Sequence, residues 1–271
     1  MDKVLFVGNG INRIHSGYSW ADLLEELKKD TQTNKEIMNG NKPFPVLYEE
    51  IYFRSKRNLQ FKEGDLLKAI VKKMKHLLPT VIHKQIMDLS ISNIITTNYD
   101  YTLENSVQKE FKIQNTIPDM AAEKVYRITT RNCVEDKSIW HVHGELKYPR
   151  SIVLGQNMYA KVVGKMNAYI EQDDFLKAYH SWIDFMFLKE VHMIGFGLDY
   201  SEIDIWAVLN ARVRYFHKHE NENTIYFYIY TENPKDISEL ETILESYHIN
   251  VIKNKENEDP ETFYMRILQA L

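Results

Sequence analysis

Short strand-like runs alternate with segments of helical periodicity along most of the chain, and this alternation limits the possible folds more than any other feature. The strand-like runs are residues 3–7, 92–100, 125–130, 138–142, 190–198, 224–230 and 248–253. Most of them are apolar throughout instead of at every second position, which is typical of parallel strands covered by helices on both faces. The sequence therefore predicts an α/β fold built on a doubly wound, mostly parallel, Rossmann-like sheet.

Helical segments fill the stretches between these runs. The first begins at Ser19, a suitable N-cap that has Asp22 three residues later. Others are predicted at residues 48–89, with breaks near Gly64 and Pro79, and at 101–111, 156–190, 201–216, 234–247 and 260–271. No internal repeat, low-complexity tract or Gly/Ser-rich linker divides the chain. We therefore expect a single domain over residues 1–271, with helical insertions at about 30–89 and 156–190.

Composition excludes several classes of protein. One cysteine in 271 residues can form neither an intrachain disulfide nor a four-cysteine zinc ribbon. A net charge of −4 gives no overall positive field that would attract nucleic acid. The longest apolar runs are far shorter than the roughly 18 residues of a membrane-spanning helix. The first strand-like run starts at residue 3, with no signal peptide before it. We expect a cytoplasmic, soluble protein with no membrane or direct nucleic-acid binding.

A glycine-containing turn follows the first strand-like run, at Gly8-Asn9-Gly10-Ile11-Asn12. Glycines there allow backbone N–H groups to approach a phosphate, together with the N-terminus of the following helix. The full dinucleotide-binding fingerprint requires a third glycine, where this chain has Arg13, and an acidic residue about 20 positions later at a strand end. A hydride-transferring Rossmann enzyme is therefore disfavoured, and a plain tight turn remains an alternative.

Polar residues end the second strand-like run, at Thr96-Thr97-Asn98-Tyr99-Asp100. At the carboxyl end of a parallel strand such groups face the ligand crevice. Asn98 and Asp100 are two positions apart, so both side chains could contact one sugar. Alternatively, they form an Asx turn and cap the helix predicted at residues 101–111.

Two histidines end a third run, at Trp140-His141-Val142-His143-Gly144. Histidines two positions apart on a strand share a face, but no third ligand is evident, so we expect no metal site. One of them is better interpreted as an acid–base group, with Gly144 leaving room for a substrate. A second glycine turn follows a later run, at Gly195-Phe196-Gly197, and Asp204 beyond it is interpreted as part of the next helix.

Taken in order, these four motifs resemble those of the sirtuin superfamily, and most closely the bacterial sirtuin-like branch of anti-phage defence systems. The resemblance covers residues 4–206. It implies an NAD site formed by the residues of the glycine turns and the second strand end: Gly8, Asn9, Gly10, Ile11, Asn12, Thr97, Asp100, Gly195, Phe196 and Gly197. Asn98 would orient the ribose and the attacking water, and His143 would be the general base, with His141 the alternative base.

Two departures from the sirtuin pattern bear on the activity. The four-cysteine zinc ribbon of protein-deacylating sirtuins cannot be built from one cysteine, and Asn12 replaces a serine of the first motif. The resemblance therefore implies an NAD hydrolase that releases nicotinamide and ADP-ribose, with NAD as substrate and no metal. The alternatives are a non-catalytic NAD or ADP-ribose sensor and a zinc-free ADP-ribosyltransferase or deacylase. Because uncontrolled NAD loss would kill the host, we expect a homo-oligomer or a complex with a separately encoded defence protein.

Overall fold

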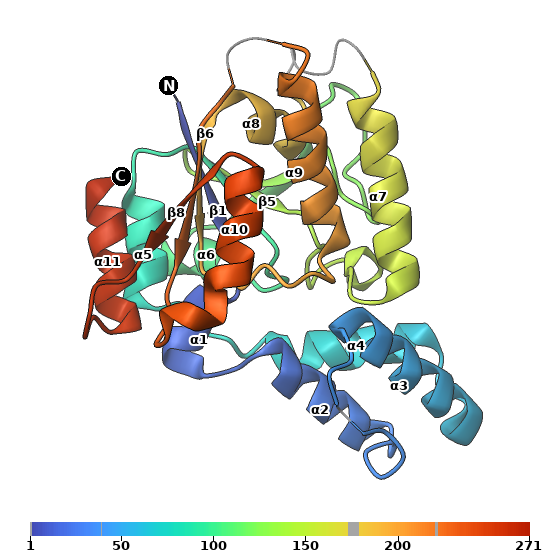
Figure 1. Ribbon diagram of the computed structural model, residues 1–271. Helices are drawn as coiled ribbons and strands as arrows, with labels where there is room; N and C mark the ends of the chain where they lie inside the picture. The colour runs from blue at the N-terminus through green and yellow to red at the C-terminus, as the bar shows by residue number, and fades with distance from the viewer. Residues whose placement is uncertain (1, 39, 173–178, 220–221) are drawn as a thin grey trace.

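The computed structural model describes residues 2–38, 40–172, 179–219 and 222–271. Within these residues one eight-stranded sheet has the strand order β3-β4-β5-β2-β1-β6-β7-β8 (Figure 1). The strands are β1 (Lys3–Val7), β2 (Asn93–Thr96), β3 (Lys112–Asn115), β4 (Thr130–Val134), β5 (Lys137–His141), β6 (Glu190–Ile194), β7 (Ile225–Ile229) and β8 (Ile249–Lys253). All neighbours from β5 to β8 pair in parallel, whereas β3 and β4 extend one edge as antiparallel strands. The predicted mostly parallel α/β sheet is confirmed.

Helices cover both faces of this sheet (Figure 1). The described helices are α1 (Gly10–Ser16), α2 (Trp20–Asp30), α3 (Phe44–Leu59), α4 (Glu63–Met74), α5 (Val81–Asp88), α6 (Thr102–Ser106), α7 (Gln156–Ile170), α8 (Trp182–Leu188), α9 (Ile203–Phe216), α10 (Ser238–Ser246) and α11 (Pro260–Ala270). On β1, Leu5 and Val7 pack into one core with α5 and α11, while Val4 and Phe6 pack into a second core with α7, α8 and α9. Burial on both faces is the reason why these strands are apolar at every position.

The helical insertion between β1 and β2 differs in detail from the prediction. The capping box at Ser19 and Asp22 is present, because each side chain accepts a hydrogen bond from the other residue's backbone N–H. The next helix starts at Phe44 instead of Tyr48, since Pro45 lies in its first turn, where proline favours a helix start. It ends at Leu59, and Gln60 after it has a left-handed conformation, so the break precedes Gly64, which lies inside α4.

Three predicted elements are wrong or shorter than expected. Residues 125–129 form no strand, because Glu123 accepts the backbone N–H groups of Ile128 and Thr129; the strand is β4. The helix predicted at residues 101–111 ends at Ser106 and is followed by the edge strand β3. The helix predicted at 156–190 is two helices, α7 and α8, and residues 173–178 lie outside the described part of the chain. The single-domain organisation stays a prediction.

The order in which the chain adds strands reverses at β1. The strands β2 to β5 lie on one side of β1, and the later strands β6 to β8 lie on its other side. In open α/β sheets a crevice forms at the carboxyl ends of the strands at such a switch point. The residues that follow β1 and β6 are the two glycine turns, so the fold brings these motifs together. None of the helices within the described ranges has the length and apolar character needed to cross a membrane.

The two glycine turns pack backbone against backbone at this point. A Cβ atom on Gly10 would lie 2.6 Å from the carbonyl oxygen of Gly195. The backbone N–H of Gly10 donates a hydrogen bond to that same oxygen over 2.7 Å. No side chain fits between the turns, so the motif needs glycine at this position for packing.

We predict that Gly10→Ala lowers the free energy of unfolding by about 1–3 kcal/mol, because the added methyl group forces two backbone segments apart. Gly164→Ala is the matched control: Gly164 lies on the exposed side of α7, and an added Cβ would have no atom within 4 Å. There the higher helix propensity of alanine should raise stability by about 1 kcal/mol. Urea unfolding followed by circular dichroism measures both, and equal effects would contradict the packing argument.

Candidate active site

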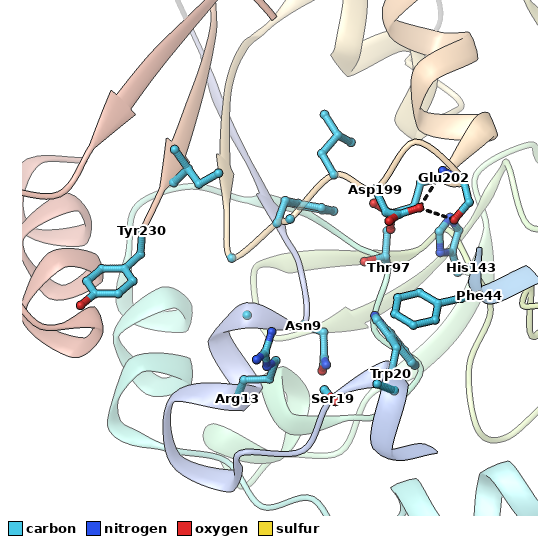
Figure 2. A pocket seen from close by; sticks show the side chains of 18 of the residues that line it. Asn9, Arg13, Ser19, Trp20, Phe44, Thr97, His143, Asp199, Glu202 and Tyr230 are labelled. Carbon is cyan, nitrogen blue, oxygen red and sulfur yellow. Dashed lines mark hydrogen bonds between the residues drawn. The ribbon is translucent and has the colours of Figure 1, made fainter. Parts of the chain in front are cut away.

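A cavity of about 950 Å³ opens at the carboxyl ends of the central parallel strands (Figure 2). Its lining residues follow five neighbouring strands: His143 follows β5, Thr97 and Tyr99 follow β2, Asn9 and Gly10 follow β1, Gly195, Phe196 and Gly197 follow β6, and Tyr230 follows β7. The insertion adds Trp20 and Phe44. The four sequence motifs therefore meet around a single cavity at the switch point of the sheet.

The two glycines of the first turn do not offer their backbone N–H groups to this cavity. The N–H of Gly8 donates to Ile194 O over 2.9 Å, and the N–H of Gly10 donates to Gly195 O over 2.7 Å. Gly8 and Ile11 are not among the lining residues, and the side chain of Ile11 is buried in the core. The glycines here permit close contact between two turns, and their amides are already hydrogen-bonded within the protein.

Asn12 and Asp100 form a buried hydrogen-bond network beneath the cavity and do not line it. Asn12 Nδ2 donates to Asp100 Oδ2 over 2.9 Å and to Asn9 Oδ1 over 3.1 Å. The other carboxylate oxygen of Asp100 accepts the backbone N–H of Thr102, so the Asx turn considered for Asp100 exists. The network ties α1 to the turn between β2 and α6, and it fixes the position of Asn9 at the cavity wall.

His83 completes this network from α5. Its Nδ1 accepts the backbone N–H of Thr80 over 3.1 Å, so the proton is on Nε2, which donates to Asn12 Oδ1 over 2.8 Å. Burial lowers the pKa of His83 to about 4. His83 is therefore neutral at physiological pH and holds Asn12 in one orientation.

Asn98 is buried beside the cavity with an unsatisfied acceptor. Its neighbours Thr97 and Tyr99 line the cavity, whereas Asn98 itself is only 3% exposed and does not. Its Oδ1 has no hydrogen-bond partner among the described residues. A buried polar atom without a partner costs free energy of about 1–3 kcal/mol, and such atoms are rare in folded proteins. The residue is thus positioned to gain a hydrogen bond when a ligand or water arrives.

His143 lies at the cavity end nearest the insertion and is paired with an acid. Its Nε2 is 2.7 Å from Asp204 Oδ2, in the first turn of α9, and its ring packs edge-on against Tyr159. Burial lowers the pKa of His143, but the charge and hydrogen bond of Asp204 outweigh that effect, so the pKa lies above its usual value. With Nε2 bound to Asp204, Nδ1 is the ring nitrogen left to exchange a proton; in the described part of the chain it has no partner.

His141 is fully engaged in a buried network and does not line the cavity. Its Nδ1 is 2.7 Å from the carbonyl oxygen of Asn98, and its Nε2 is 2.8 Å from Glu104 Oε1. Burial lowers the pKa of His141, but the charge and hydrogen bond of Glu104, the charge of Glu145 and the hydrogen bond to Asn98 together raise it above its usual value. The two neighbouring oxygens are both acceptors, which suits a ring that carries a proton on each nitrogen. Because both nitrogens then donate to acceptors, His141 holds the Asn98 backbone and is no candidate for the base.

Gly144 allows the backbone to turn sharply, and it leaves no space for a substrate. Its φ is +91°, and an added Cβ would lie 2.2 Å from the carbonyl oxygen of Ser151. The space that the sequence analysis assigned to a substrate is thus occupied by the chain itself. The glycine lets the chain turn directly after His143.

Sequence reasoning missed Asp204 and Glu202 as site residues. Asp204 was interpreted as an ordinary residue of the following helix, although an acid just after a glycine turn at a strand end was a usable signal. Glu202 lines the cavity, and burial raises its pKa to about 7. Only the pairing of β5, β2, β1 and β6 brings these acids to His143. Among the described residues no group of three or more His, Cys, Asp or Glu side chains is arranged to hold a metal ion.

Comparisons with known proteins agree with this arrangement. The profile of the SIR2-like domain matches residues 92–252, which is more than half of the chain. The NAD(+) hydrolase ThsA of Bacillus cereus (strain MSX-D12) is 26% identical over 174 residues, which are 63% of this chain. The aligned segment spans only 33% of ThsA, so the relative is about three times longer than the part that matches. The predicted relation to the sirtuins is confirmed: the chain belongs to the family of SIR2-like domains.

Proposed function

We propose that this protein hydrolyses NAD to nicotinamide and ADP-ribose. The observation that carries the proposal is the pairing of His143 with Asp204 at one end of a cavity that lies at the switch point of the sheet. The cavity volume of about 950 Å³ is at the upper end of the roughly 300–1,000 Å³ range of small-molecule and cofactor pockets, which suits a ligand as large as a dinucleotide. The relative ThsA is an NAD(+) hydrolase, which supports the same reaction.

The reaction breaks the bond between C1′ of the ribose and the nicotinamide nitrogen. The electron pair of this bond leaves with nicotinamide, which becomes a neutral molecule, and the ribose carbon develops positive charge. Water attacks that carbon, and its proton passes to His143 Nδ1, while Asp204 stabilises the imidazolium that forms. General base catalysis of this kind contributes about 10²–10⁴-fold in rate.

Asn98 positions the reactants in this proposal. Its unsatisfied Oδ1 would accept a hydrogen bond from the attacking water or a ribose hydroxyl. The backbone of Asn98 is held by His141, so only the side chain needs to move for the amide to reach the cavity between Thr97 and Tyr99. Orientation of two reactants is among the largest contributions available to an enzyme, which fits a reaction with no covalent chemistry on the protein.

We extend the proposal to a role in anti-phage defence, which the motif resemblance supports. A free NAD hydrolase would deplete the NAD of its own cell, so the activity needs a restraint. We therefore propose a cytoplasmic protein whose activity is controlled by self-assembly or by a separately encoded partner. Light scattering of the purified chain, alone and with the product of an adjacent gene, tests this part. A monomer that is fully active by itself would contradict it.

The direct test is incubation of the purified protein with NAD, with the products separated by liquid chromatography. We expect nicotinamide and ADP-ribose in equal amounts. Binding of NAD without nicotinamide release, in every assembly state and with every adjacent gene product, would favour a sensor instead. Attachment of ADP-ribose to an added protein would favour a transferase.

Substitution of Asn98 should separate stability from activity. Because Asn98→Ala removes an unsatisfied buried acceptor, the free energy of unfolding should stay constant or rise by up to about 1 kcal/mol. Turnover should fall by about 100-fold or more, since the reactants lose their orientation. Asn105→Ala, at an exposed position of α6, is the control and should turn over NAD like the wild type. A large loss of stability with retained turnover would assign Asn98 a structural role only.

The pH dependence of turnover should report the pairing of His143 with Asp204. As a base His143 must be unprotonated, so kcat/KM should fall as the pH drops below its raised pKa. In Asp204→Asn the charge of Asp204 is lost and only the smaller effect of Glu202 still raises the pKa against burial, so this acidic limb should move to lower pH. Asp88→Asn, an exposed position on α5, should leave the limb in place. An unshifted limb in Asp204→Asn would mean that another group is the base.

A further inference from the structure

The cavity contains one guanidinium among several carboxylates. Arg13 is the only Lys or Arg side chain that lines it in the described part of the chain, whereas Asp199, Glu202, Glu232 and Asp236 also line it. A diphosphate group is repelled by carboxylates and attracted by a cation, and both effects grow at short distance inside a cavity. The charge arrangement therefore favours a diphosphate only near Arg13.

Three backbone N–H groups of the glycine turn next to Arg13 are already engaged within the protein, which makes a side-chain cation more important for holding a phosphate. The N–H groups of Gly8 and Gly10 donate to carbonyl oxygens of β6 and the turn after it, and the N–H of Ile11 donates to Gly8 O over 3.3 Å. In a phosphate-binding glycine turn, such backbone N–H groups would point at the phosphate. In this chain the turn packs against its neighbour instead.

Arg13 is free to take this role. Its side chain is exposed and forms no ion pair or side-chain hydrogen bond within residues 2–38, 40–172, 179–219 and 222–271. The nearby Asp22 accepts hydrogen bonds from the backbone and side chain of Ser19 instead. In Figure 2 Arg13 lies beside Asn9, with Tyr230 on one side of this pair and His143 on the other. Its position along the cavity is thus between the two ends where the halves of a dinucleotide would lie.

We propose that Arg13 binds the diphosphate of the substrate and thereby places the nicotinamide ribose at His143. This inference rests on the proposed function, because it assigns the substrate's central group to a residue of the same cavity. The planar guanidinium can donate two parallel hydrogen bonds to phosphate oxygens, which fixes orientation as well as position. The role differs from that of His143, since Arg13 would contact a part of the substrate that does not react.

The first experiment measures steady-state kinetics of NAD cleavage for the wild type, Arg13→Gln and Arg13→Lys. Arg13→Gln should raise KM by about 10- to 100-fold and change kcat much less, because a contact with a non-reacting group contributes equally to substrate and transition state. Arg13→Lys keeps the charge but loses the paired donors, so its KM should lie between the other two. Arg150→Gln, which removes an exposed arginine outside the cavity, is the matched control and should leave KM unchanged.

The second experiment measures binding of ADP-ribose and of adenosine by calorimetry, which needs no turnover. Arg13→Gln should weaken ADP-ribose binding by about the same factor as KM and leave adenosine binding unchanged, because adenosine has no phosphate. Added salt should weaken ADP-ribose binding to the wild type more than to Arg13→Gln, since an exposed cation is screened.

The outcomes separate this inference from the proposed function. Wild-type binding of ADP-ribose that depends on Arg13, without nicotinamide release, would support the inference and overturn the hydrolase. Normal hydrolysis with equal KM and equal ADP-ribose affinity in the wild type and Arg13→Gln would overturn the inference alone. An equal loss of ADP-ribose and adenosine binding would also overturn it, because it would indicate damage to the cavity as a whole.

Discussion

Two glycine turns touch backbone to backbone where the sheet switches direction, and the position of the cavity depends on that contact. Val7 of β1 pairs in register with Ile194 of β6, and the hydrogen bonds from Gly8 and Gly10 continue this pairing beyond the strand ends. Because a Cβ on Gly10 would meet the Gly195 carbonyl, only glycine lets the two turns approach this closely. The same contact occupies the backbone N–H groups of Gly8 and Gly10, so these two donors are not available to a ligand.

Within the described ranges, buried polar groups around the cavity are hydrogen-bonded in part and without partners in part. Beneath it, Asn12 is held by His83, Asp100 and Asn9, and His141 is held between Glu104 and the Asn98 backbone. Beside it, Asn98 Oδ1 and Asp204 Oδ1 are buried without partners among the described residues. Glu104 Oε2, next to His141, is also buried without a partner among these residues, so such atoms occur both beneath and beside the cavity, and each costs free energy until something binds it.

Periodicity and turn residues predicted most of the sheet and part of the site. The runs around residues 3–7, 190–194 and 225–229 are strands because both of their faces are buried, which leaves a continuous apolar signal. The antiparallel edge was missed because β3 is polar and half-exposed and carries no such signal. Residues 125–129 have the residue pattern of a strand, but the side chain of Glu123 accepts the backbone N–H groups of Ile128 and Thr129, and no strand forms there. A local pattern cannot reveal a competing acceptor that tertiary structure supplies.

The sequence by itself determined the family, the α/β class and the order of the four motifs, because these depend on local residue types and their spacing. The motif resemblance favours His143 over His141 as the base, but only the tertiary structure shows which hydrogen bonds each ring makes. Glu104 and the Asn98 carbonyl occupy both nitrogens of His141, while Asp204 occupies one nitrogen of His143. Likewise, the backbone N–H groups of Gly8 and Gly10 find their acceptors only because β1 pairs with β6. Hydrogen-bond partners come from residues far apart in the chain, so only the packed fold selects them.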